Sequence, residues 1–192
     1  LNPPPQRKIS DFKSKLAGGG ARSNLFEVEL SFPSAVEVDG LNDILNKARF
    51  LVKTANLPAS NVAPIEVPFR GRILKVAGDR TFDTWTITVI NDTDFSIRSA
   101  MEKWMNTINK VSDYTSLTNP ADYQADAYVY QLDRNGDTLR KYRFYDVFPT
   151  QVSAIELSYD AQGIQEFTVE MQVLYWEAIR GSGENAGGEN IT

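Results

Sequence analysis

Alternation of apolar and polar residues dominates the middle of the chain. Every second residue from Phe26 to Phe32 is apolar, and the residues between them are Glu or Ser. Residues 84–89 alternate in the same way and are rich in β-branched side chains, which favour a strand. A period of two predicts half-buried β-strands. The same pattern recurs at residues 128–132, 142–148, 155–159 and 167–175.

The sequence Asn135-Gly136 separates two of these alternating runs. This dipeptide between two strands is a strong signal of a β-hairpin. Residues 133–137 also faintly resemble a calcium loop, but the spacing is wrong and the late bidentate Glu is missing. We therefore predict that residues 128–132 and 142–148 pair as a hairpin.

Residues 95–110 break the period of two. Apolar residues recur there at spacings of three and four, which predicts an amphipathic helix. Thr93 or Asp94 is the expected cap, and the helix is expected to lie against the sheet. The members of the apolar stripe are Ile97, Met101, Trp104 and Ile108.

The region before the second alternating run predicts shorter elements. Residues 41–48 are expected to form a short helical turn, and residues 50–57 a strand that Pro58 ends. Residues 58–75 contain three prolines among apolar residues, so they predict an edge strand or a projecting hairpin arm. Residues 78–80, Gly-Asp-Arg, are expected to form a tight turn.

The order of these elements predicts a mainly β protein. We expect an antiparallel β-sandwich or barrel with one flanking α-helix, spanning residues 25–178. Residues 1–24 are predicted to be a flexible arm, and residues 179–192 a flexible, Gly-rich tail. Side chains fill a barrel of this size, so little room for a substrate is expected inside it.

Composition narrows the chemistry. The 192 residues include no histidine and no cysteine, so serine triads, thiolate zinc sites and disulfides are excluded. Asp79 and Asp83 are interpreted as solvated loop residues and not as an acid/base pair. Residues 18–20 are interpreted as a hinge and not as a phosphate cradle. No cofactor or metal is expected, and the protein is not expected to be an enzyme.

Charge and hydropathy indicate where the chain acts. The 20 basic and 25 acidic residues, a net charge of −5, argue against tight binding of nucleic acid. The apolar runs are far shorter than a membrane span, and the first residues lack the pattern of a signal peptide, so synthesis in the cytoplasm is expected.

Four segments of the chain, residues 24–28, 56–58, 77–92 and 175–177, share one further feature. Together they resemble the tail tube protein of contractile-tailed bacteriophages, and the resemblance extends over about residues 22–178. It implies a ring-forming β-barrel with a flanking helix, a structural component of the virion assembled in the host cytoplasm. It further implies hexameric rings, joined through a continuous inner sheet and stacked into a tube. The implied partners are other copies of the chain, a sheath, a baseplate and a tube terminator, and DNA passes through the lumen without specific binding.

This resemblance makes the proline-bearing arm, residues 58–75, and the ends of strands candidates for contacts between subunits. The alternatives are the tube of a type VI or extracellular injection machine, a baseplate protein that initiates the tube, a carbohydrate-binding sandwich and a carboxylate hydrolase. The candidate contact residues are Ile65, Val67, Phe69, Asp79, Arg80 and Trp176.

Overall fold

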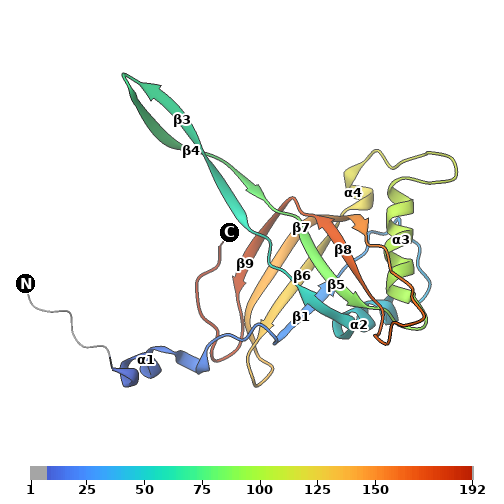
Figure 1. The fold of residues 1–192 in the computed structure, drawn as a ribbon, viewed down its shortest axis with the longest axis horizontal. Helices are drawn as coiled ribbons and strands as arrows, with labels where there is room; N and C mark the ends of the chain where they lie inside the picture. Colours follow the sequence, from blue (N-terminus) through green and yellow to red (C-terminus); the bar gives the residue numbers. More distant parts are fainter. Residues whose placement is uncertain (1–7, 192) are drawn as a thin grey trace, which may run out of the picture.

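The computed structural model describes residues 8–191 and contains a seven-stranded antiparallel sheet curled into a barrel (Figure 1). The strand order is β1-β6-β7-β8-β5-β2, and β9 pairs with β7 beside β8. The predicted antiparallel β-barrel with a flanking α-helix is confirmed, and the structure has further helices beside it. The strands are β1 (Phe26–Leu30), β2 (Val52–Ala55), β5 (Trp85–Ile90), β6 (Ala125–Leu132), β7 (Thr138–Val152), β8 (Glu166–Gln172) and β9 (Tyr175–Arg180).

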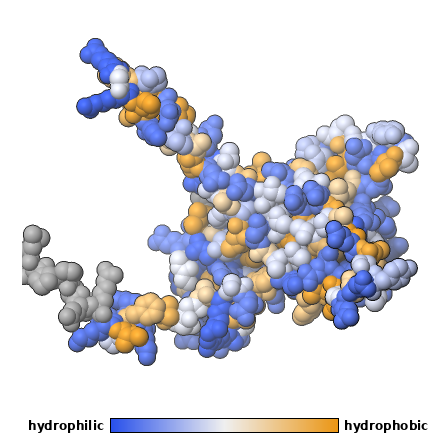
Figure 2. Space-filling view, viewed as in Figure 1, coloured by the Kyte–Doolittle hydropathy of each residue, from blue (hydrophilic) through white to orange (hydrophobic). Residues whose placement is uncertain are grey.

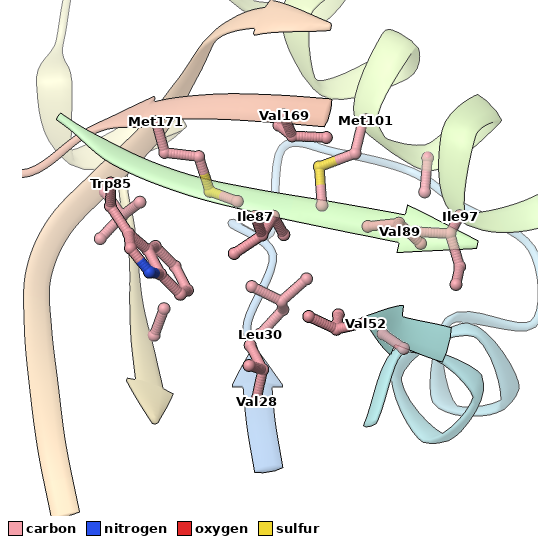
Figure 3. Packing of buried hydrophobic residues seen from close by; sticks show 14 of the residues in the cluster. Val28, Leu30, Val52, Trp85, Ile87, Val89, Ile97, Met101, Val169 and Met171 are labelled. Carbon is pink, nitrogen blue, oxygen red and sulfur yellow. The ribbon is translucent and has the colours of Figure 1, made fainter. Parts of the chain in front are cut away.

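Alternate residues of each strand point into one apolar core. Trp85 pairs with Met171 and Ile87 with Val169, so successive buried pairs line the same face of β5 and β8. The α3 helix (Ser96–Ile108) places Met101 against this layer (Figure 3). The α2 helix (Leu41–Leu51) buries Ile44 and Ala48 beside β1.

The predicted amphipathic helix is confirmed as α3, with Ile97, Met101 and Trp104 buried. Its cap differs from the prediction. The N-cap residue is Phe95, in a left-handed conformation with φ of 52°, and no side chain caps the helix. Asp92 and Asp94 instead bind Lys47 of α2 at 3.0 and 2.8 Å, and these carboxylates raise the pKa of the Lys47 ammonium.

The predicted strand at residues 50–57 begins too early. The α2 helix continues to Leu51, and β2 starts at Val52. Phe50 is highly exposed on the helix. The helix persists because no proline or glycine interrupts residues 41–55, and the apolar spacing of three and four continues through Ala48.

Two strand predictions near the C-terminus are wrong. Residues 155–159 form no strand, and Leu157 and Tyr159 are exposed, because β8 already has β5 and β7 as neighbours. The single strand predicted from residue 167 onward is two strands. The chain turns at residues 173–174, and β9 then pairs with the first half of β7.

The loop between β6 and β7 confirms the predicted hairpin. One carboxylate oxygen of Asp133 accepts hydrogen bonds from the N–H groups of Asn135 and Asp137, at 2.7 and 3.0 Å. Gly136 has a φ of 91°, which glycine adopts without strain. Backbone donors thus use a carboxylate oxygen that a calcium ion would need. Within residues 8–191 no cluster of acidic side chains could hold a metal ion, and no helix could cross a membrane.

The segments outside the barrel lie on different sides of it (Figure 1). The strands β3 (Ser60–Phe69) and β4 (Arg72–Phe82) form a two-stranded ribbon that projects from the barrel. The α3 helix and the short α4 helix (Pro120–Tyr123) lie on the side away from this ribbon. The N-terminal segment carries α1 (Ile9–Lys15) and a 3-10 turn (Ala17–Gly19). Residues 1–7 of the predicted arm and Thr192 lie outside the described residues.

Candidate assembly surfaces

The β3–β4 ribbon is exposed along nearly its whole length. All ten residues of β3 are exposed, and the ribbon has solvent on both faces. Of the two structures predicted for residues 58–75, the projecting hairpin is the one formed. Its strands reverse at Arg70 and Gly71, which have φ angles of 44° and 80°. Two successive left-handed residues are the geometry of a tight two-residue hairpin turn.

One face of the ribbon is apolar. Residues that pair directly across two strands have side chains on the same face. Ile65 pairs with Val76, and Val67 with Leu74, so these side chains share a face with Phe69. We call these residues the apolar face of the ribbon: Ile65, Val67, Phe69, Leu74 and Val76.

The opposite face of the ribbon is different in character. Glu66 and Lys75 pair across the strands and form an ion pair of 3.2 Å. Pro64 and Pro68 have their side chains on the same face. Because proline has no N–H, both residues also limit the pairing of a further strand at the edge of β3. Figure 2 shows hydrophobic atoms along the ribbon, outside the body of the protein. An apolar face that the chain itself does not cover is typical of a surface that another protein covers.

The predicted turn at residues 78–80 is wrong, because these residues lie within β4. Between the pairs Val62–Arg80 and Pro64–Ala77, β4 has one more residue than β3, which is a β-bulge. A Cβ on Gly78 would lie 2.5 Å from the carbonyl oxygen of Ala63. Gly78 therefore permits a close backbone approach at the bulge and not a chain reversal.

The candidate residues at this bulge lie on its surface. Asp79 and Arg80 are exposed in β4, and their predicted contacts with another subunit stay predictions. Asp83 does not form an acid/base pair with Asp79. Its carboxylate accepts a hydrogen bond of 3.0 Å from the side-chain amide of Asn61, which ties the two strands together at the root of the ribbon.

Aromatic side chains hold the root of the ribbon on the barrel. The rings of Phe82 and Trp176 meet edge to face at 6.2 Å, and Trp176 meets Tyr142 in the same way at 5.9 Å. Trp176 is half-buried and packs against the core. It therefore positions the ribbon within its own chain, and its predicted contact with another subunit stays a prediction.

The outer face of strands β1, β6, β7 and β9 carries a second group of side chains. Lys141 lies 4.1 Å from the ring centre of Tyr128, and Arg143 lies 4.3 Å from that of Tyr145. Arg143 also binds Asp126 at 2.6 Å. Tyr and Arg are enriched where proteins bind each other. Sequence reasoning missed this surface, although the polar positions of the alternating runs on β6 and β7 contain it.

Tyr130 on this face is expected to remain protonated at high pH. Burial, and then its hydrogen bond of 2.8 Å to Glu29, raise its pKa to about 12. The protonated Tyr130 hydroxyl therefore stabilises the folded protein. Because its folded-state pKa lies above the ordinary value of 10, this stabilisation is fully present below pH 10. It is lost as the pH rises through about 12. Tyrosinate absorbance during a pH titration measures the pKa, and Tyr130→Phe identifies the signal. Glu29→Gln should lower the pKa, and an unchanged value would show that the carboxylate has no part in the shift.

Residues 21–178 match the family described as "Phage tail tube protein". The chain belongs to this family. The resemblance inferred from the four sequence segments is therefore confirmed. The match ends two residues before the end of β9, so the C-terminal tail of this tail tube protein lies beyond the match.

Curated relatives support this assignment. The tail tube protein gp19 of Enterobacteria phage T4 is 34% identical over 163 residues, which cover 84% of this chain and 93% of that protein. The tail tube protein of Serratia phage KSP90 is 29% identical over 175 residues, which cover 89% of this chain and 96% of that protein.

Solved structures share the fold of this tail tube protein at low sequence identity. A chain of the anti-feeding prophage baseplate has a TM-score of 0.62 at 10% identity, covering 83% of this chain and 95% of that one. A chain of the sheath-tube complex of the extracellular contractile injection system PVC has a TM-score of 0.59 at 11% identity, covering 90% and 98%. These similarities show the barrel architecture alone.

Proposed function

We propose that this chain is the structural subunit of the inner tube of a contractile phage tail. Six copies form a ring, the rings stack, and the genome passes through the lumen. The observation that carries the proposal is the apolar face of the ribbon, which projects from the barrel and which the chain does not cover. A head-to-tail contact between an arm and another copy repeats indefinitely, and such a contact builds a polymer.

The charge of the chain suits a conduit for DNA. The net charge is −5, and an acidic wall repels phosphate, so DNA moves along it without adhering. The relatives at 34% and 29% identity are phage proteins, whereas the injection-system chains are only 10–11% identical. This difference favours a phage tail over an injection machine.

The role requires protein partners and no substrate. A sheath outside the tube, a baseplate at one end and a terminator at the other are the partners we propose. The solved structures that share the fold come from complexes whose names include sheath, tube and baseplate, and the proposed sheath and baseplate partners agree with those names. Assembly in the host cytoplasm and a place in the virion follow from this role. We propose a structural role without catalysis.

Concentrated, purified protein is expected to form sixfold rings and short tubes, seen by negative-stain electron microscopy and by mass photometry. The ribbon supplies the contact between rings, so the tubes should lengthen with protein concentration. Particles that stay monomeric at every concentration and salt condition, also with baseplate added, would contradict the proposal.

A further inference from the structure

Residues 181–191 fold back along the outer edge of β9. The backbone N–H of Ile191 donates to the carbonyl oxygen of Ala178 at 2.8 Å. The N–H of Arg180 donates to the side-chain oxygen of Asn190 at 2.9 Å. Ala178 pairs with Tyr142 of β7 on its other side, so β9 lies between β7 and this segment. The tail therefore occupies the strand edge that the barrel leaves open.

The glycines of this segment fit it closely to the barrel. A Cβ on Gly181 would lie 1.8 Å from the carbonyl oxygen of Thr138. A Cβ on Gly183 would lie 2.6 Å from Asp137, and one on Gly188 would lie 2.6 Å from the guanidinium of Arg140. Composition predicted that these glycines make the tail flexible. Their lack of a side chain also lets the tail approach the start of β7 closely.

The segment is held at several points but is mostly exposed. The guanidinium of Arg180 donates to the carbonyl oxygen of Ala186 at 3.0 Å, and Ala186 is buried. The amide of Asn185 donates to Asp133 at 3.2 Å. Ile191, the residue paired with β9, is half exposed. Few apolar atoms would therefore become exposed if the segment left the edge.

An open strand edge offers unpaired N–H and C=O groups to another strand, and proteins usually cover it. The carbonyl of Ala178 and the N–H of Arg180 cannot bind the tail and a neighbouring strand in the same way at once. We propose that residues 181–191 are a displaceable cover of the β9 edge, and that a strand of a second copy of this chain replaces them when a ring forms. The inference rests on the proposed function, because it concerns the assembly of that ring.

The sheet itself indicates a second copy as the replacement. Strands β1, β6, β7 and β9 pair antiparallel in this order. An even number of alternating strands leaves β1 and β9 pointing in opposite directions. Copies related by rotation about one axis can therefore join β9 of one copy to β1 of the next as an antiparallel pair.

A reversible disulfide tests the inference in the full chain. The chain has no cysteine, so Ala178→Cys with Ile191→Cys introduces one defined pair. These residues lie directly opposite each other, and Cα atoms of paired antiparallel residues are within disulfide range. The oxidised protein should form rings at least about tenfold more slowly than the wild type, and reduction should restore the rate.

A shortened chain that ends at Gly181 provides the opposite change. It loses the two hydrogen bonds that cover the edge, so its critical concentration for ring formation should fall about tenfold. Light scattering against concentration measures this value, and circular dichroism checks that the barrel is folded. If the oxidised, reduced and shortened proteins all form rings equally well, the proposal that residues 181–191 cover the β9 edge is wrong. If the wild type forms no rings, the proposed function itself fails.

Discussion

Leu74→Asp is expected to abolish the stacking of rings while the barrel stays folded. Leu74 lies on the apolar face of the ribbon, opposite Val67. A carboxylate placed in an apolar contact loses its hydration without gaining a partner, which costs several kcal/mol. Stacking should weaken at least about 100-fold, which corresponds to about 3 kcal/mol. Sedimentation and electron microscopy measure the tubes, and thermal unfolding measures the barrel.

Ile73→Asp is the matched control for this change. Ile73 and Leu74 are adjacent and equally exposed, at 60%, but their side chains lie on opposite faces of the ribbon. The control should retain most of the stacking. Loss of stacking in both variants would show that the choice of face is wrong. Unfolding of the Leu74→Asp protein would instead make Leu74 a residue of the folded core.

Trp85→Ala is expected to give the largest loss of stability. Trp85 is fully buried and stacks on Phe144 with ring centres 4.6 Å apart. Removing a buried aromatic side chain leaves a cavity and costs about 3–5 kcal/mol. Urea unfolding of the unassembled protein measures the free energy of unfolding. Assembly should fail as a consequence, because the ribbon and the strand edges need a folded barrel.

Phe50→Ala is the control for the core substitution. Phe50 is 84% exposed on α2, so its removal should change the free energy of unfolding by less than about 0.5 kcal/mol. A small effect of Trp85→Ala would contradict the placement of the core. A large effect of Phe50→Ala would mean that α2 packs differently from the arrangement described.

The hydrophobic pattern within single segments correctly predicted the strands and the helix that bury one face against the core. The alternation in β1, β5 and β8 and the stripe of α3 were sufficient, because these elements each bury one face against a single core. The ribbon was predicted from its prolines. The residues named for it, Ile65, Val67 and Phe69, lie on one face together.

The errors arose where pairing, and not the pattern, decides the structure. Residues 155–159 alternate as a strand does, but the neighbouring strand β8 is already paired on both edges, with β5 and β7. At residues 173–174 the buried face changes from odd to even positions, from Val173 to Trp176, and an alternating pattern cannot show a corner that three-dimensional pairing imposes. The bulge at Gly78 depends on the close approach of Ala63. The two residues are far apart in the sequence, so the pattern around Gly78 does not indicate this contact.

The most informative signal for the assembly surface was present but unused. Leu74 and Val76 alternate with Ile73 and Lys75 in β4, and their alignment with β3 follows once the turn is placed at Arg70 and Gly71. A turn was predicted at residues 78–80 and none at Arg70 and Gly71, so the second half of the apolar face was not predicted. The Tyr and Arg group on the outer sheet needs β6 and β7 to be aligned, which no single segment shows.

Cryo-electron microscopy of tubes assembled from the purified chain tests the central claim most directly. The account predicts stacked sixfold rings in which the apolar face of each ribbon, with Val67 and Leu74, lies against the adjacent ring. Tubes in which the ribbons extend freely into solvent, or preparations that contain only single subunits, would contradict it.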